Sequence, residues 1–593
     1  MNEEEKLALI GDKKIPNRVL IKRIMEYVKP EWVKFFFALL LIAVTVAFDL
    51  LLPMVLKEVT NNLQSEVITE NILTNIIILA SGYLGLGIFN QGVAYIENML
   101  LQRAGQNIIY RIRYDVFEHI ENMSQNQFNE MPVGSLVTRV ANYTTTMSDL
   151  FTNVLVHIIR DVITVVAVYV VMFTISVRLS LILLAFVVAI FVISLLFSKI
   201  IYKIFRKERE DTSALNAFLN ESLSGMRIIQ FFNQQARKDK EFSKINNNLK
   251  SDRYHVVLAF GVYRPLINLL YLSAVAVTFY FGSRYLNAGE VVAFYLFLSK
   301  FFNPVQELAD KLNHIQRAKT ASERLFNLLD VAPEVLDKPH AQEVSTFKGK
   351  IEFRHVWFAY IPGEWILKDV SFVVDPGETC AFVGATGAGK TTILSLLVRN
   401  YEIQKGQILI DDIDITEIKI DSLRKGIGQM LQDVFLFSGN IKDNITLHDD
   451  SFSEEEITEA CHYVNADSFI DKMEHGLNEE VIERGENFSQ GQRQLLSFAR
   501  TILHKPQILI LDEATANIDT ETEVLIQQSL EKMKNIGTML VVAHRLSTIQ
   551  KADCIIVLQH GEVIEKGNHQ SLLKQKGHYY KLYQMQYENQ KAN

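Results

Sequence analysis

Six long apolar stretches crowd the first half of this 593-residue chain and restrict the folds open to it. Each stretch is close to the roughly 20 residues that a helix needs to cross a bilayer. The stretches lie at 33–56, 72–97, 150–175, 177–198, 256–282 and 290–312. The overall apolar content of 49% is ordinary, because the average over the whole chain hides this crowding. The sequence therefore predicts a helical transmembrane domain with six spans.

Basic residues give these spans an orientation. The connections near 98–149 and 199–255 are long and rich in Arg and Lys, whereas the short connection 57–70 carries three Glu against one Lys. The positive-inside rule then places the N-terminus and both long loops in the cytosol, as expected for a multi-pass protein of the cell (inner or plasma) membrane. The composition of the long loops is helical, so the spans are predicted to continue as helices beyond the bilayer.

Two features lie at the edges of this domain. Residues 17–29 mix apolar and basic side chains just before the first span, which is typical of an amphipathic helix on a membrane surface. An ordinary soluble amphipathic helix is the alternative. Turns are predicted at the loop tips 128–134 and 223–229, where apolar residues stand beside charge. Each tip is either a docking surface or a solvated turn, and composition leaves both open.

Several ionisable residues fall inside the predicted spans, namely Asp49, His157, Arg160, Asp161 and Arg264. Charge is costly in lipid, so these side chains should face a protein interior or a water-filled cavity. Contact with a substrate or ion is one interpretation, and pairing between helices is the other. The adjacent Arg160 and Asp161 point in different directions on a helix, so each needs a partner on another segment. Pairing is therefore favoured for these two.

The second half carries a phosphate-binding loop. Residues 384–391 fit the pattern G-x-x-x-x-G-K-[ST], between an apolar strand at 379–383 and a helix at 393–398. Backbone N–H groups and the helix dipole favour an anion there. Lys390 is expected to reach the β- and γ-phosphates of ATP, and the Thr391 hydroxyl to hold Mg²⁺. The predicted nucleotide-binding residues of this loop are Gly384, Ala385, Thr386, Gly387, Ala388, Gly389, Lys390, Thr391 and Thr392.

A second motif in the same half completes a hydrolytic site. Residues 507–511 read as a buried strand that ends in Asp512 and Glu513. Asp512 is expected to orient a water on Mg²⁺, and Glu513 to act as general base for the attacking water. From Ile351 onward the pattern is that of an α/β domain, preceded by a linker at 326–348 that holds two prolines.

Between these motifs, Ser489-Gln490-Gly491-Gln492 opens a predicted helix that can present N–H groups to an anion. Here the chain resembles the ATP-binding cassette (ABC) family, whose Leu-Ser-Gly-Gly-Gln motif occupies this place. The resemblance extends over essentially the whole chain and is to the exporter branch, with a six-span helical transmembrane domain fused to an α/β P-loop ATPase domain. The expected domains are 1–32 (cytosolic segment), 33–325 (transmembrane), 326–348 (linker) and 349–593 (ATPase).

The resemblance gives roles to further residues. Tyr360 resembles the aromatic residue that stacks on adenine, and Gln432 the glutamine that touches Mg²⁺ and senses the membrane domain. Asp519 resembles the D-loop aspartate, and His544 the switch histidine at the γ-phosphate. Glu483-Arg484-Gly485 is similar to the exporter X-loop, and the membrane loop tips to coupling helices.

The family also implies a dimer, because two cassettes close head to tail over two ATP molecules. Ser489, Gly491 and Gln492 would then contact the ATP of the other subunit. The signature departs from the family pattern with Phe488 for Leu and Gln490 for Gly. In some exporters an altered signature faces a weak site in a different partner, so a heterodimer with a second half-transporter is favoured. A homodimer with neutral variation is the alternative.

The function implied is ATP-driven export of amphipathic small molecules, either drugs or lipids. Peptide export, import on the exporter fold and an ATP-gated channel are alternatives. The net charge of −8 argues against a nucleic-acid partner. The three cysteines form no CxxC pair and are typical of reduced cytosolic thiols, and the acidic first residues lack the pattern of a signal peptide. The substrate and the residues that contact it stay open.

Overall fold

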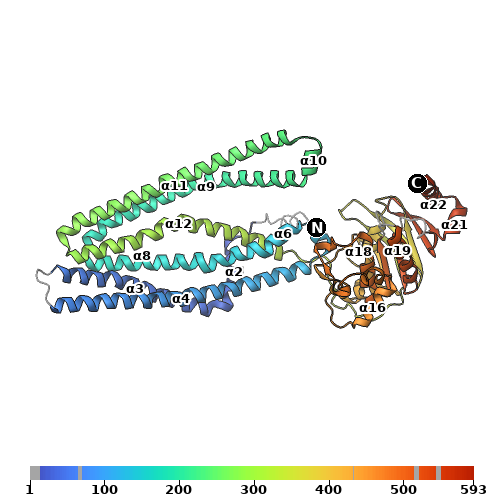
Figure 1. Ribbon diagram of the computed structural model, residues 1–593, viewed down its shortest axis with the longest axis horizontal. Helices are drawn as coiled ribbons and strands as arrows, with labels where there is room; N and C mark the ends of the chain where they lie inside the picture. Colours follow the sequence, from blue (N-terminus) through green and yellow to red (C-terminus); the bar gives the residue numbers. More distant parts are fainter. Residues whose placement is uncertain (1–13, 65–69, 432, 513–519, 543–548, 593) are drawn as a thin grey trace. The chain divides into compact units, whose positions relative to one another are not determined.

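The computed structural model describes residues 14–64, 70–431, 433–512, 520–542 and 549–592. The chain forms two compact units (Figure 1). The first unit comprises Met1–Glu121 and Met131–Val331, and the second comprises Asn122–Glu130 and Ala332–Asn593. All three cysteines are buried and free.

The first unit consists of helices. Five helical stretches in the described part of the chain are long and apolar enough to cross a membrane. They are Asn17–Leu63, Asn71–Glu121, Val133–Ile175, Val177–Ser224 and Gln235–Tyr285. The long helices are α3 (Trp32–Leu63), α4 (Glu70–Glu121), α8 (Val156–Ile175), α9 (Val177–Ser224), α11 (Gln235–Tyr285) and α12 (Ala288–Leu329). The amphipathic stretch forms the helix α2 (Asn17–Val28), which buries Leu20, Ile24 and Val28.

Six spans were expected, and the sixth is not confirmed. Helix α12 covers the stretch at 290–312, but it is not among the five apolar stretches. The apolar residues there are interrupted by charge, including Lys300 and Lys311, which the sequence interpretation did not weigh. Around these lysines α12 supplies much of the core of the unit, with Phe294, Phe297 and Phe302 fully buried.

The long loops are helical, as predicted. Helices α9 and α11 run side by side and are joined by the short helix α10 (Met226–Phe231) (Figure 1). The third membrane helix begins at Val133, so it continues beyond the predicted span at 150–175, and it passes through two π-helical segments, Arg139–Tyr143 and Leu150–Leu155. Its α-helical pieces before α8 are α6 (Val133–Thr138) and α7 (Thr144–Asp149).

Each predicted loop-tip turn is present but short, and a short helix stands beside it: residues 130–132 lie between α5 and α6, and Gly225 lies between α9 and α10. The first tip holds α5 (Gln125–Asn129), which Ser124 and Gln127 start with a reciprocal capping box. Gln127 is 1% exposed and donates a hydrogen bond to the carbonyl of Ala332 at 2.8 Å. The solvated-turn interpretation is therefore wrong for the first tip. At the second tip, only Gly225 separates α9 from α10.

The second unit is built on two main sheets. A four-stranded antiparallel sheet has the order β2-β1-β4-β5, and a six-stranded sheet has the order β12-β11-β3-β10-β9-β6. The latter is parallel except for β12. The strands are β1 (Ile351–Phe358), β2 (Leu367–Val374), β3 (Thr379–Val383), β4 (Lys405–Ile410), β5 (Ile413–Asp414), β6 (Ile427–Met430), β7 (Gly439–Asn440), β8 (Glu480–Val481), β9 (Ile508–Asp512), β10 (Thr538–Val542), β11 (Cys554–Gln559) and β12 (Glu562–Gly567).

Helices cover the parallel sheet, which explains why its central strands are continuously apolar. Strands β3 and β10 are buried along their full length. One core cluster joins this sheet to the antiparallel one, and another packs it against helix α18 through residues such as Leu495 and Leu509. The helices of this unit are α13 (Lys390–Leu397), α14 (Ile420–Gly426), α15 (Ile441–Thr446), α16 (Glu454–Tyr463), α17 (Asp467–Ile470), α18 (Gln490–Leu503), α19 (Thr520–Met533), α21 (His569–Gln575) and α22 (His578–Ala592).

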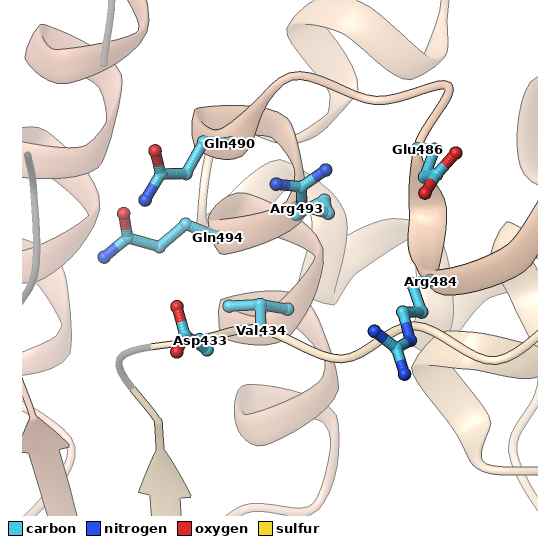
Figure 2. Close-up of a pocket in the computed structure, with 7 residues that line it drawn as sticks. All are labelled: Asp433, Val434, Arg484, Glu486, Gln490, Arg493 and Gln494. Atoms are coloured by element: carbon cyan, nitrogen blue, oxygen red, sulfur yellow. The ribbon is translucent and has the colours of Figure 1, made fainter. Parts of the chain in front are cut away.

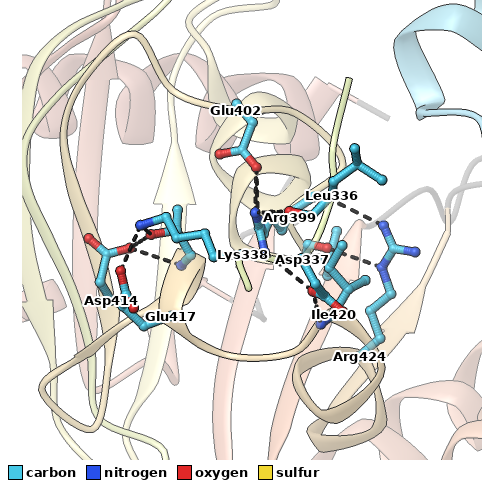
Figure 3. A network of polar contacts seen from close by, with 11 residues as sticks. Leu336, Asp337, Lys338, Arg399, Glu402, Asp414, Glu417, Ile420 and Arg424 are labelled. Carbon is cyan, nitrogen blue, oxygen red and sulfur yellow. Dashed lines mark hydrogen bonds and ion pairs between the residues drawn. The ribbon is translucent and has the colours of Figure 1, made fainter. Parts of the chain in front are cut away.

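The segment predicted as a linker, 326–348, is more ordered than that prediction implies. Its first residues belong to α12, which ends at Leu329. Residues Leu336–Lys338 are then fixed to the second unit (Figure 3). The Asp337 carboxylate accepts a hydrogen bond from the backbone N–H of Ile420 at 2.9 Å, and Lys338 pairs with Glu417 at 2.7 Å.

Candidate functional site

The phosphate loop lies where the sequence placed it, between β3 and α13. Its glycines are required by geometry. Gly389 caps α13 with φ of +101°, and a Cβ there would approach Leu367 Cδ2 to 2.6 Å. A Cβ on Gly384 would lie 2.3 Å from the carbonyl oxygen of Leu558. The loop is therefore held tightly against its neighbours and turns directly into the positive end of a helix.

Lys390 is folded back over this loop. It is 6% exposed, and its ammonium group donates hydrogen bonds to the carbonyl oxygens of Gly384 at 2.8 Å and Ala385 at 3.1 Å. Burial lowers the pKa of Lys390, and the nearby charge of Asp512 opposes that shift. A desolvated ammonium beside a glycine loop is well placed to take a phosphate oxygen in exchange for these carbonyls.

Asp512 lies near the phosphate loop, at the end of a strand of the parallel sheet. It ends β9, and Val542 on β10 pairs with both Asp512 and Phe382 of β3. The carboxyl ends of β9 and β3 therefore meet at one edge. Thr391 and Asp512 line a common cavity of about 580 Å³. A hydroxyl and a carboxylate are oxygen ligands of the kind that Mg²⁺ takes, so these residues fit the metal that the motif implies.

Tyr360 lines the same cavity. Its hydroxyl and Thr392 Oγ1 lie 3.2 Å apart and share a hydrogen bond. The ring is 42% exposed and meets the rings of Phe358 and Tyr401 edge-on, with the Tyr401 centroid 5.1 Å away. Two aromatic neighbours thus hold the Tyr360 ring, while part of it stays open to a planar ligand. The sequence interpretation did not include Tyr401.

Helix α18 carries the signature residues and begins as predicted. Ser489 is its N-cap, and the capping box is closed by Gln492, whose side chain accepts a hydrogen bond from the N–H of Ser489 at 2.8 Å. Gly491 is buried in the first turn. Ser489, Gly491 and Gln492 do not line the cavity of Thr391 and Asp512. Within one chain the two parts of the predicted site are therefore separate.

Beside the signature lies a second cavity of about 260 Å³ (Figure 2). Gln490, Arg493 and Gln494 project from α18, opposite Arg484 and Glu486 of the X-loop segment. Arg493 donates hydrogen bonds to the carbonyls of Gly485 at 3.2 Å and Phe488 at 3.1 Å, which ties that segment to the start of α18. The sequence interpretation missed Arg493, because its role depends on backbone carbonyls that only the fold brings near. Asp433 and Val434 complete the lining.

Four predicted site residues lie outside the described part of the chain: Gln432, Glu513, Asp519 and His544. Their roles stay predictions.

In the first unit, the flagged ionisable residues pair between helices. Asp49 of α3 pairs with Lys300 of α12 at 2.7 Å, and Arg160 of α8 pairs with Glu97 of α4 at 3.5 Å. Asp161 of α8 pairs with Lys311 of α12. Arg160 and Asp161 each have a partner on another helix, as their adjacency predicted. The sequence interpretation did not name these partners.

Arg264 and His157 are the other two ionisable residues predicted inside the spans. The Arg264 guanidinium lies over the ring of Phe260, 5.6 Å from its centroid, on the same helix. His157 lies near the start of α8.

Comparisons with known proteins agree with this arrangement. Long apolar helices joined to a phosphate-loop ATPase unit define a membrane transport protein driven by ATP. Residues 35–305 match the family model described as ABC transporter transmembrane region, and residues 367–516 match the ABC transporter model. The chain belongs to the ABC transporter family.

Individual relatives are similar over nearly the whole chain. A putative ABC transporter ATP-binding protein, exp8, of Streptococcus pneumoniae is 40% identical, over 96% of this chain and 97% of that protein. An ATP-dependent lipid A-core flippase of Desulfotalea psychrophila is 33% identical over 96% of this chain and its own full length. A probable multidrug resistance ABC transporter, YheH, of Bacillus subtilis is 38% identical over 87% of this chain and 77% of that protein.

The fold is similar to a solved structure as well. A bacterial Atm1-family ABC exporter with ATP bound matches with a TM-score of 0.78 and 28% identity, over 93% of this chain and 98% of that chain. The fold is that of an ABC exporter half-transporter, with a helical transmembrane part followed by an ABC ATPase.

Proposed function

We propose that this protein is one half of a dimeric ABC exporter that moves amphipathic small molecules, drugs or lipids, by alternating access. One observation supports the proposal of a dimer. Lys390, Thr391 and Asp512 gather at one edge of the sheet, whereas Ser489 and Gly491, at the start of α18, do not line the cavity of Thr391 and Asp512. A second cassette, turned head to tail, would bring its own Ser489-type end to this phosphate loop.

Each residue of an ATP site is proposed to have its own role. Lys390 would hold the β- and γ-phosphates, and Tyr360 would stack on adenine. Thr391, Gln432 and Asp512 would hold Mg²⁺, which when bound neutralises phosphate charge. Glu513 would take the proton of the attacking water, and His544 and Asp519 would complete the closed site. The exchange of Lys390 from loop carbonyls to phosphate is the step that the described geometry supports most directly.

The substrate class rests on the relatives, which include a lipid A-core flippase, a fatty acid transporter and a probable multidrug transporter. Two of these names give a lipid or a fatty acid as the cargo, and the third gives multidrug resistance. We place the transmembrane domain at 33–325 with α12 as its sixth helix, the linker at 326–348 and the ATPase at 349–593. The protein would lie in the cell membrane with its N-terminus and ATPase in the cytoplasm.

Coupling between membrane and ATPase parts would run through the short helices at the loop tips. Helix α5 belongs to the second unit, where Gln127 donates a hydrogen bond to the Ala332 carbonyl. Helix α10 exposes Phe231 (81%) and Ile228 (65%), too much apolar surface for a solvated turn. It is therefore proposed to dock on an ATPase unit, with the partner subunit supplying the groove.

The partner is proposed to be a different half-transporter. Of the two signature departures, Phe488 is 4% exposed and belongs to the hydrophobic core, so an apolar residue of another shape is accommodated there. Gln490 is the departure that bears on the partner, because it opens α18 and lines the signature cavity. A polar side chain in place of glycine at that position is expected to weaken one of the two composite ATP sites.

The decisive experiment is Mg²⁺-dependent ATPase activity of the purified chain, with Glu513→Gln as the inactive control. Negligible activity that a co-expressed partner restores, and that Glu513→Gln abolishes again, supports the heterodimer. Robust activity of the chain alone, lost in Glu513→Gln, supports a homodimer and rejects the proposed pairing. Activity that survives Glu513→Gln in both settings means that Glu513 is not the base. Export is then tested by ATP-dependent uptake of an amphipathic dye into inverted vesicles, whose outer face is the cytoplasmic one.

A further inference from the structure

A large cavity lies at the edge of the parallel sheet opposite the phosphate loop. Its volume is about 670 Å³, and it is lined by the first residues of β6 and by Pro506 and Gln507, which precede β9. Strands β6, β9, β10 and β3 are mutually parallel, so their amino ends share one edge. The phosphate loop follows the carboxyl end of β3 at the other edge. None of the phosphate-loop residues lines this cavity.

The lining is strongly basic for a protein with a net charge of −8. Among the lining residues four are cationic and one is anionic. Arg424 and Lys425 come from the last turn of α14, Arg500 from α18, and Lys505 from the turn after α18. The carboxylate is that of Asp421, one turn before Lys425.

Two of these cations are held in place by neutral groups. Arg500 donates hydrogen bonds to the Asn444 carbonyl at 2.8 Å and to Asn444 Oδ1 at 3.2 Å, and burial lowers its pKa. Arg424 donates to the carbonyls of Val398 and Arg399, each at 3.4 Å. Neutral acceptors orient a guanidinium without cancelling its charge. Arg500 is half-buried and gains more from an anion than a solvated cation does, whereas Arg424 is exposed.

Lys505 differs, because it pairs with Glu456 at 3.4 Å at the rim. His504, beside it, also lines the cavity, and burial lowers its pKa. The rest of the lining includes Leu447 and Pro506, so the walls combine charge with apolar surface. The volume falls within the range of small-molecule sites.

We propose that this cavity binds a small phosphorylated metabolite, whose phosphate lies among Arg424, Lys425 and Arg500 and whose carbon body lies against Leu447 and Pro506. Guanidinium groups match the oxygens of a phosphate in geometry and charge. The cavity adjoins the ATP-side cavity, because Arg424, Ile427 and Gln429 line both. Strand β6 thus runs from the metabolite site to Met430, two residues before Gln432. Occupancy is expected to change the ATPase rate.

Binding is tested with inorganic pyrophosphate as the probe and the full-length detergent-solubilised chain as the protein. The Lys390→Ala background removes the phosphate loop as a competing site, so the assay depends on neither ATP hydrolysis nor transport. Isothermal titration is expected to find one remaining pyrophosphate site, which Lys425→Glu weakens by about tenfold or more. Lys425 is exposed and outside the catalytic site, so this variant should fold.

Lys348→Glu is the matched control, because Lys348 is equally exposed and does not line the cavity. It makes the same charge change and should leave pyrophosphate binding unchanged. Absence of binding in the Lys390→Ala background would overturn the proposal. So would binding that Lys425→Glu and Lys348→Glu weaken equally, because that result indicates a general charge effect. Failure here would leave the proposed export function standing, since none of these readouts uses it.

Discussion

Arg399 donates a hydrogen bond to the carbonyl oxygen of Leu336 at 2.8 Å and so ties the segment that follows the membrane unit to the end of the phosphate-loop helix (Figure 3). The Arg399 side chain is only 3% exposed, and its charge is balanced by Glu402 at 2.8 Å and Asp337 at 3.8 Å. Its backbone takes the left-handed region, with φ of +53°, directly after α13. The segment is thus anchored two residues beyond the helix that begins at Lys390.

Removing this anchor should destabilise the ATPase unit. Arg399→Ala leaves Glu402 and Asp337 without their shared cation and the Leu336 carbonyl without its donor, at an expected cost of about 3 kcal/mol. Lys338→Ala removes an exposed pair with Glu417 from the same segment and should cost less than about 1 kcal/mol. Thermal unfolding of the two variants in detergent measures the difference. Equal midpoints for both would show that the buried arginine is not the anchor.

The capping serine of α18 offers a test that separates stability from catalysis. Ser489 and Ser453 both close capping boxes, on α18 and α16. Replacing either with Ala should cost about 1 kcal/mol of stability through the lost cap. Only Ser489→Ala should also reduce ATP turnover, by about tenfold or more, because Ser489 is proposed to contact ATP held by the other subunit. The Mg²⁺-ATPase rate in the assembled dimer is the measurement. A similar fall in Ser453→Ala would mean that both act through stability alone.

Local sequence predicted the strand, the turn and the helix of the phosphate loop, and the reason is physical. The strand, the glycine turn and the helix around Lys390 are consecutive in the sequence. The residues that form the phosphate loop are therefore the same residues that make up its recognisable sequence motif. Asp512 was predictable because a buried apolar strand ending in a carboxylate has few other uses once a phosphate loop is present. The Arg399 anchor was not predictable, because its partner Leu336 is 63 residues away.

In the membrane unit, local sequence did not predict which charged residues pair. Averaging hydropathy over a span identifies apolar stretches but hides single charges within them, so Lys300 and Lys311 were overlooked while Asp49 and Asp161 were noticed. Which charges meet depends on how helices far apart in sequence pack together, and one sequence does not contain that information. The need of Asp161 for a partner could be predicted, whereas the identity of that partner could not.

The pair between Asp161 and Lys311 joins α8 to α12 and should behave as a unit. Asp161→Asn or Lys311→Met alone leaves one charge without its partner, at an expected cost of roughly 3 kcal/mol. The double variant removes both charges and should recover most of that loss. Thermal midpoints of the four proteins form a double-mutant cycle, with Arg206→Ala as a control on an exposed pair of α9. Additive losses in the double variant would refute a coupled pair.

The last prediction concerns Lys390 and pH. In the chain without nucleotide, burial keeps the pKa of Lys390 below its usual value. The phosphates of ATP favour the charged form and should raise that pKa, so binding at alkaline pH takes up protons. Affinity for ATP should be full well below the nucleotide-free pKa of Lys390 and should fall as pH rises through it.

Calorimetric titration of ATP at about pH 9, in two buffers of different ionisation enthalpy, measures the proton uptake directly. Lys390→Arg keeps a charge that does not titrate in this range and should abolish the uptake. Equal uptake by Lys390→Arg would assign the proton to another group, and no uptake by the unaltered chain would mean that Lys390 is already fully charged before ATP arrives.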